Sequence, residues 1–182
     1  RFLAPAPVQP WTDVRDAFDF GHYAPQSTRS RGAKQLQFFS PLGPVAGTTP
    51  SEDCLYLNLW SPGVMDGARR PVMLWLHGGG YDQGTGGAIG YDGLALAKRH
   101  DVVTVTVNHR LNVLGYLYLG GILGGEFAEA ANPGQQDIVQ ALRWVHDNIE
   151  AFGGDPSRVM IFSSDFGVGR RNRWHVPRPW SR

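Results

Sequence analysis

The sequence predicts an α/β fold with a mainly parallel sheet covered by helices. Two observations carry this prediction: short apolar runs typical of buried strands, and helical patterns that alternate with the later runs. In such folds ligands bind at the carboxyl ends of the strands, so functional residues are expected directly after these runs. The strand-like runs cover 54–60, 71–76, 101–107 and 159–162, and the helical patterns cover 94–100 and 136–152.

Each element has a local cause. The runs at 71–76 and 101–107 are nearly continuous in apolar and β-branched residues, which is typical of strands covered on both faces. The pattern at 136–152 repeats apolar residues three and four positions apart, and two glycines end it. Asp155-Pro156-Ser157 then predicts a turn into the last strand. The proline-rich first ten residues predict an extended segment on the surface.

Composition indicates one folded domain over residues 1–162 and a different kind of sequence after it. The chain of 182 residues is 42% hydrophobic and carries a net charge of +1. These values, and the lack of a long apolar run, argue against nucleic acid and membrane as partners. Residues 163–182 hold five arginines against the single Asp165, so we separate them as an atypical tail rich in Arg, Trp and Pro. Cys54 is the one cysteine, which favours a reducing, cytoplasmic location.

A glycine run follows the strand at 71–76. It reads His77-Gly78-Gly79-Gly80-Tyr81 and lies where such a sheet binds its ligands. Glycines let the backbone turn its N–H groups toward a cavity, where two donors can stabilise an oxyanion during acyl transfer. A structural turn and a phosphate-binding loop are the alternatives. An HGGG run after a strand, however, is the oxyanion-hole arrangement of lipases and esterases.

Six segments together resemble the type-B carboxylesterase family, which includes the cholinesterases and the bacterial para-nitrobenzyl esterases, the latter closest in style. Residues 52–58, Glu-Asp-Cys-Leu-Tyr-Leu-Asn, are similar to the family's second signature. The resemblance runs from Arg1 to about Phe162 and implies the α/β-hydrolase fold, of which this chain is a partial, N-terminal fragment. The other segments, which agree in order and spacing, lie at 71–81, 105–111, 132–137, 142–149 and 152–156.

The resemblance also implies an activity. It is that of a serine carboxylesterase, which hydrolyses small-molecule esters and needs no cofactor or metal. By resemblance, Gly79 and Gly80 supply two oxyanion-hole N–H groups, and a third comes from the residue after the nucleophile. His77 and Gly78 shape the loop.

Two ion pairs and one missing disulfide follow from the same resemblance. Arg1 is expected to pair with Glu52, and Arg110 with Asp137, which fixes loops rather than takes part in the chemistry. Secreted members of the family pair the cysteine of the Glu-Asp-Cys signature with one that precedes Pro-Gln. This chain has Ala24 there, which is consistent with an intracellular protein.

The chain departs from the family at the nucleophile. The family follows its Val-x-Ile-Phe strand with Gly-Glu-Ser-Ala/Gly-Gly, a sharp elbow that exposes the serine. Residues 163–169 here read Ser-Ser-Asp-Phe-Gly-Val-Gly, so Asp165 takes the serine position, and no G-x-S-x-G occurs in the chain. Either Asp165 is a designed-in replacement, which Phe166 would crowd, or the reading frame slips near residue 163. Read one nucleotide later, codons for 166–169 that end in G or C can spell Ser-Gly-Ser-Gly.

Three interpretations of function stay open. The first is a serine carboxylesterase, of which this chain should be inactive because it lacks the triad. The second is a non-catalytic, cholinesterase-like protein for binding or adhesion. The third is a piece that does not fold stably, because strands that should cover the sheet edges are missing. Apart from His77, the histidines are expected in structural or surface roles without a metal, and they are His22, His100, His109, His146 and His175.

Overall fold

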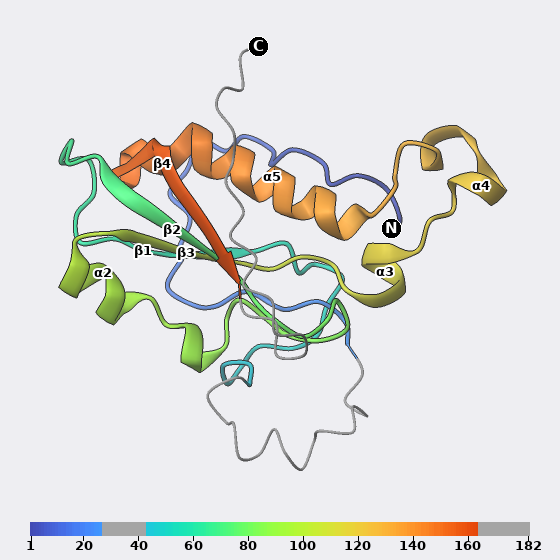
Figure 1. The fold of residues 1–182 in the computed structure, drawn as a ribbon, viewed down its shortest axis with the longest axis horizontal. Helices are drawn as coiled ribbons and strands as arrows, with labels where there is room; N and C mark the ends of the chain where they lie inside the picture. The colour runs from blue at the N-terminus through green and yellow to red at the C-terminus, as the bar shows by residue number, and fades with distance from the viewer. Residues whose placement is uncertain (27–42, 164–182) are drawn as a thin grey trace.

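A computed structural model describes residues 1–26 and 43–163 of the chain (Figure 1). These residues contain a four-stranded sheet in the order β1-β3-β2-β4. Strands β2, β3 and β4 run parallel, and β1 pairs with β3 antiparallel, which confirms the mainly parallel sheet. The strands are β1 (Leu57–Trp60), β2 (Arg70–Leu76), β3 (Val103–Val107) and β4 (Gly154–Ser163).

Helices cover both faces of the sheet. Figure 1 shows the long helix α5 on one side of the sheet and α2 on the other. The α-helices are α2 (Leu94–His100), α3 (Asn112–Tyr116), α4 (Gly120–Leu123) and α5 (Pro133–Asn148). Short 3-10 helices complete the set, and they are η2 (Ile89–Tyr91), η3 (Gly125–Phe127) and η4 (Ile149–Phe152).

The main core lies between the central strands and α5. All five residues of β3 are buried, because both faces of this strand are covered. Helix α5 contributes Val145, and η4 contributes Ile149, each fully buried. Apolar residues that recur along one side of the helix thus meet the sheet, as the sequence pattern predicts. The cluster comprises Val72, Leu74, Val103, Val105, Val107, Val145 and Ile149.

The predicted helix at 136–152 is present with different bounds. Helix α5 begins three residues earlier, with Pro133 in its first turn. Proline suits this position because its missing N–H would have no partner inside the helix. The last four residues of the predicted helix form η4, and Gly153 follows in the left-handed conformation with φ +75°. The glycine stop signal is therefore confirmed.

The last strand begins earlier than predicted. Strand β4 starts at Gly154 rather than at 159, and Gly154 pairs with Arg70. The next pair along β2 is Val72 with Val159, so the four intervening residues bulge out of the register. Within this bulge Ser157 donates to Asp155 through its amide at 2.8 Å and through its hydroxyl at 2.7 Å. The predicted turn exists, but as an irregularity inside the strand.

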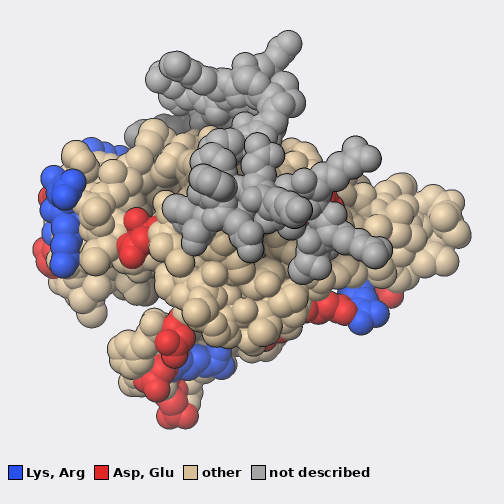
Figure 2. Space-filling view, turned by 90° about the horizontal axis from the view of Figure 1, so that it is seen from below, with Lys and Arg blue, Asp and Glu red and all other residues tan. Residues whose placement is uncertain are grey.

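The N-terminal segment runs over the surface, as predicted. Its first 22 residues form no helix or strand and are mostly exposed. Figure 2 shows acidic and basic side chains close together at the periphery of one face rather than in a broad patch of one sign. No described helix has the length and the apolar composition needed to cross a bilayer.

Candidate active site

The carboxyl ends of the parallel strands meet at one edge of the sheet. Leu76 pairs with Val107 on one side and with Ser163 on the other. The residues that follow β2, β3 and β4 therefore start side by side, as expected from the sequence. Two of these three segments are described; the third begins at residue 164, outside the described residues. We name residues 77–84, which follow β2, the glycine loop.

Glycine is required at the centre of the loop. Gly79 has φ +123°, and a Cβ there would lie 2.0 Å from the carbonyl oxygen of Gln83. The Gly79 carbonyl accepts hydrogen bonds from the amides of Asp82 at 3.1 Å and Gln83 at 3.3 Å, which closes a tight turn. Any side chain at this position would open that turn.

Two amides of the loop are not used by the described part of the chain. Neither Gly79 nor Gly80 donates its N–H to another described residue. Gly80 has φ +63°, and a Cβ built there meets nothing within 4 Å, so this part of the loop borders open space. Two adjacent amides of this kind at the carboxyl end of a sheet form an arrangement that can bind an anion.

Residues far away in the sequence anchor the loop. Gly84 donates its amide to Oε1 of Gln26 at 2.8 Å, and Nε2 of Gln26 donates back to the Gly84 carbonyl at 2.9 Å. Asn112 donates its amide to the carbonyl of Tyr81 and its side-chain Nδ2 to the carbonyl of Asp82, both at 2.9 Å. Neither Gln26 nor Asn112 was predicted from the sequence, because neither carries a local signal of this contact.

Two buried histidines stack at the start of the loop: His77, its first residue, and His109, which follows β3. The rings of His77 and His109 stack with centroids 4.8 Å apart and planes 8° apart. In each ring Nδ1 faces the carbonyl oxygen of the next residue, Gly78 at 2.9 Å and Arg110 at 3.0 Å. A carbonyl only accepts, so the proton of each neutral ring is assigned to Nδ1. His109, expected in a structural or surface role, is 4% exposed and contacts the site.

Burial keeps both rings neutral at physiological pH. Burial, with the neighbouring His109 as a second cause, lowers the pKa of His77 to about 4. Burial also lowers the pKa of His109. The remaining described histidines, His22, His100 and His146, are exposed, in agreement with their predicted surface roles. Within the described ranges no group of three His, Cys, Asp or Glu side chains could hold a metal ion.

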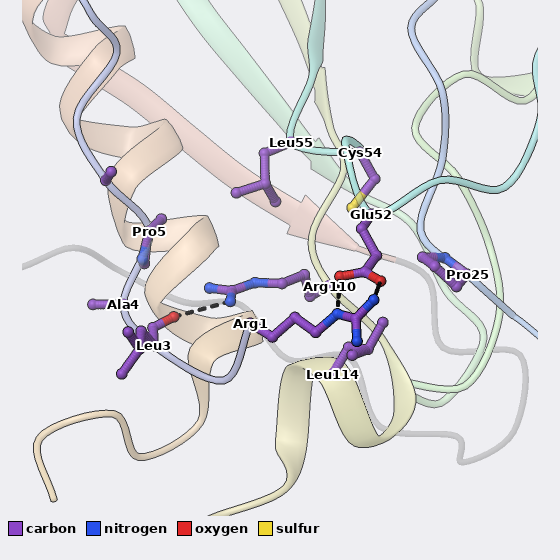
Figure 3. A pocket seen from close by; sticks show the side chains of 11 residues that line it. Arg1, Leu3, Ala4, Pro5, Pro25, Glu52, Cys54, Leu55, Arg110 and Leu114 are labelled. Carbon is purple, nitrogen blue, oxygen red and sulfur yellow. Dashed lines mark hydrogen bonds and ion pairs between the residues drawn. The ribbon is translucent and has the colours of Figure 1, made fainter. Parts of the chain in front are cut away.

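Both expected ion pairs are present, and they differ in burial. Asp137, whose side chain is 1% exposed, accepts from Nη2 of Arg110 at 2.6 Å and from Nε at 2.8 Å. Arg110 also donates to the carbonyl of Leu3, which ties down the N-terminal segment. Arg1 and Glu52 form an exposed pair at the rim of a cavity of about 310 Å³ (Figure 3). Both pairs hold loops near the strand ends.

Ala24 lies where the resemblance puts a cysteine. It is 1% exposed and forms one buried cluster with Cys54 and Leu111. Burial raises the pKa of the Cys54 thiol to about 11, so this thiol is not reactive at neutral pH. The predicted nucleophile position, Asp165, and its neighbour Ser164 lie outside the described residues, whereas Ser163 ends β4 and is exposed.

The mainly parallel sheet, its covering helices and the glycine loop after β2 define part of an α/β-hydrolase fold. The model of the carboxylesterase family matches residues 1–169, and the chain belongs to this family. A solved relative is carboxylesterase EST55 of Geobacillus stearothermophilus, which is 46% identical with a TM-score of 0.75. That match covers 90% of this chain and 30% of EST55.

Relatives known by sequence include enzymes and one protein that is not named as an esterase. Carboxylesterase 3 of Homo sapiens is 45% identical over 92% of this chain and 28% of its own length. The para-nitrobenzyl esterase of Bacillus subtilis is 38% identical over 92% and 32%. Neuroligin-3 of Mus musculus is 36% identical over 92% and 23%. The chain thus spans less than a third of the length of these proteins.

Proposed function

We propose that the chain carries the oxyanion-binding part of a serine carboxylesterase, which hydrolyses small carboxylic esters. The observation that carries the proposal is the glycine loop, in which no described residue accepts from the amides of Gly79 and Gly80. When a serine attacks an ester carbonyl, the carbonyl oxygen gains negative charge, and two aimed N–H groups stabilise it. The serine's proton passes to a histidine, which returns it to the departing alcohol; water then releases the acid.

We further propose that the 182 residues alone do not turn over an ester. Asp165 stands at the position that the family gives to serine, and the chain has no G-x-S-x-G elbow. His77 and His109 are poor substitutes for the catalytic base, because both rings are buried and hold their Nδ1 atoms against backbone carbonyls. Oxyanion stabilisation without a nucleophile and a base provides no covalent route.

A chimera tests the activity. Residues 1–162 of this chain would replace the matching segment of the Bacillus subtilis para-nitrobenzyl esterase, which then supplies the remaining parts. We expect the chimera to hydrolyse p-nitrophenyl acetate. In it, Gly79→Ala should lower kcat about 10²- to 10³-fold, because the new methyl displaces the loop amides.

Gly67→Ala is the matched control for this chimera. Gly67 also has a positive φ, +67°, but a Cβ there meets nothing within 4 Å, and the residue lies in the connection between β1 and β2. A folded chimera without activity would contradict the carboxylesterase proposal. An active chimera that is indifferent to Gly79→Ala would instead reject the oxyanion role of the loop.

The inactivity of the chain has its own test. The purified 182-residue chain and its Asp165→Ser, Phe166→Ala variant would be assayed with p-nitrophenyl acetate. We expect no turnover by either, because the histidine and the acidic partner of the triad are not supplied. Clear turnover by the unmodified chain would show that the nucleophile has been misassigned.

We propose a slipped reading frame as the origin of residues 163–182. The support is the change in composition after Phe162 and the Ser-Gly-Ser-Gly that the shifted frame can encode for 166–169. The family match ends at residue 169, shortly after this junction. Sequencing the parent DNA through this junction decides the point: an intact frame relative to relatives would overturn the proposal.

A non-catalytic binding protein is the second candidate. Asp165 in place of serine favours it, as does the match to neuroligin-3, a relative that is not named as an esterase. Limited proteolysis of the 182-residue chain separates this function from a piece without a stable fold. A binding module should give a resistant core that contains β1 to β4, whereas a piece without a stable fold should be digested throughout.

We propose the cytoplasm as the location. The buried pair of Ala24 and Cys54 supports it, because no disulfide forms where the secreted members of the family are expected to have one. Fractionation of cells that express the protein checks this proposal, and recovery from the culture medium or an extracytoplasmic fraction would contradict it.

A further inference from the structure

Four aromatic rings connect the beginning of the glycine loop to its middle. His77 stacks on His109, and His109 meets Tyr116 edge to face, with centroids 6.3 Å apart and planes 87° apart. Tyr116 then packs against Tyr81, at 4.7 Å between centroids. His77 and Tyr81 belong to the loop, His109 follows β3, and Tyr116 ends α3. We name these four residues the ring clamp, because they hold the segment 77–81 at both of its ends.

The loop needs such support because its backbone is strained. Tyr81 has φ +65°, a left-handed conformation that is sterically unfavourable for a residue with a side chain. The amides of Gly79 and Gly80 donate to no described residue. The rings of the clamp fix the two residues that flank the glycines, His77 and Tyr81.

Among the described residues, the clamp has no counter-ion for a positive charge. The titratable or charged groups around the histidine pair are Tyr81, Tyr116, Arg110 and Asp137. The carboxylate of Asp137 raises the pKa of His109, but Arg110 already neutralises it through two hydrogen bonds. A proton on either ring would be a buried charge next to a second ring at 4.8 Å.

We propose that the ring clamp positions the amides of Gly79 and Gly80, and that uptake of a proton by its histidine pair opens the loop. His109 and Tyr116 are then positioning residues, which act through His77 and Tyr81 and do not touch the substrate. This inference rests on the proposed function, in which those amides bind the oxyanion. It adds that the oxyanion site is held only while both rings are neutral.

The direction of the pH effect follows from the burial. In the closed loop the pKa of His77 lies at about 4, whereas an exposed imidazole has a pKa of 6.5. The open loop therefore binds more protons below neutral pH, and acid favours it. If the ring regains its ordinary pKa on opening, the opening equilibrium constant rises about twentyfold between roughly pH 7 and pH 5.

Amide hydrogen exchange of the 182-residue chain, followed by NMR, measures the opening. The reporters are amides whose hydrogen bonds close the loop: Gln83 to Gly79, Gly84 to Gln26, and Asn112 to Tyr81. After correction for the intrinsic rate, their exchange should rise about twentyfold from pH 7 to pH 5. The amide of Val105 in the core exchanges only on global unfolding and should be slower than the reporters at both pH values. Reporter rates that do not change with pH, or reporters that exchange no faster than Val105, would overturn the proposal.

Variants separate ring packing from proton uptake. Tyr116→Ala removes the ring and should raise reporter exchange at pH 7 by about tenfold, the equivalent of one aromatic pair. Tyr116→Phe keeps the ring and removes only the 3.3 Å contact between the Tyr116 hydroxyl and Nδ1 of His109, so its rise should be clearly smaller. His77→Phe with His109→Phe keeps two stacked rings that bind no proton, so the acid response should disappear. His146→Ala, which removes an exposed histidine, should retain it. A response that survives in the double variant would reject the histidine pair as its source.

The two proposals fail separately. Amide exchange needs no ester and no nucleophile, so an inactive chimera together with an acid-sensitive loop would reject the esterase and keep the clamp. An active chimera together with reporters that ignore pH would reject the clamp and keep the esterase.

Discussion

The two ends of the parallel sheet are held by different forces. At the amino ends, Arg70 donates to Asp66 and to Asp101, and Arg69 donates to Glu150 and to Asp155. At the carboxyl ends, the neutral ring clamp, Gln26 and Asn112 hold the glycine loop. The buried ion pair of Arg110 and Asp137 also lies at this end of the sheet.

The difference fits what each end has to do. At the amino ends, the exposed pair of Arg69 and Glu150 can lose one partner at little cost, because water hydrates the other instead. A site that is proposed to stabilise a developing negative charge needs aimed donors, and unpaired carboxylates nearby would oppose that charge. In the described part of the carboxyl end, Arg110 neutralises the buried Asp137, both histidines are uncharged, and the loop's own carboxylate, Asp82, is exposed to water. Four predictions test the contrast, beginning with the largest effect.

Arg110→Met should be the most destabilising change, because it leaves Asp137 as a buried, unpaired carboxylate. We expect the free energy of unfolding in urea to fall by about 3 to 5 kcal/mol. The double variant Arg110→Met, Asp137→Leu is the control, and it should recover most of the loss. A single variant that is no less stable than the double variant would show that the pair is effectively exposed.

Gly84→Ala should destabilise by about 3 kcal/mol, from backbone strain and overpacking together. Gly84 has φ +119°, and a Cβ there would lie 2.3 Å from Nδ1 of His77 and 2.5 Å from the Gly78 carbonyl. Gly47→Ala, at φ +89° with nothing within 4 Å, carries the strain without the collision. Equal losses in urea unfolding for the two variants would mean that the histidine does not pack against the loop.

Acid should lower the stability of the fold through the buried histidine at the carboxyl end. The pKa of His77 is lowered in the folded state, so the unfolded chain binds more protons, and stability falls as pH drops below about 6.5 toward 4. Between roughly pH 7 and pH 5 the loss is on the order of 2 kcal/mol for this one group. Urea unfolding at both values measures it. The same loss in the variant His77→Phe, His109→Phe would assign the effect to other groups.

Arg69→Ala should have the smallest effect, below about 1 kcal/mol. Its side chain is 56% exposed and reaches Glu150 and Asp155 at 3.0 Å, and water can replace the contact with the exposed Glu150. Asp155 also keeps its hydrogen bonds from Ser157. A loss in urea unfolding as large as that of Arg110→Met would remove the contrast between the two ends of the sheet.

Local patterns were sufficient for most of the fold. The runs at 71–76 and 101–107 predicted β2 and β3, because a short run of nearly continuous apolar residues is typical of a strand that is covered on both faces. The predicted start of β4 was wrong, since the backbone of Gly154 pairs with Arg70 before the bulge, and no apolar side chain signals that pairing. Helix α5 began early because Pro133, which interrupts a helix elsewhere, is favourable in the first turn.

The sequence predicted the glycine loop of the site but not the residues that hold this loop in place. The glycine run is a local motif, and its glycines have the positive φ values that such a loop requires at Gly79 and Gly80. Gln26 is 58 residues away from the Gly84 that it binds, so no window of sequence connects them. No residue pattern around His109 indicates its role. The role becomes apparent only in the fold, where β3 pairs with β2 and the His109 ring stacks on His77.

The sequence by itself determined the order of the four strands and of helices α2 and α5, the glycine loop, and the resemblance that the family match confirms. These properties depend on residues close together along the chain, where propensity and hydrophobic period act. Only the tertiary structure decided which charges are paired, which histidines are neutral and what holds the loop. Burial and pairing are properties of residues that meet across the sheet, and the pKa of a group follows from those neighbours rather than from its own position in the sequence.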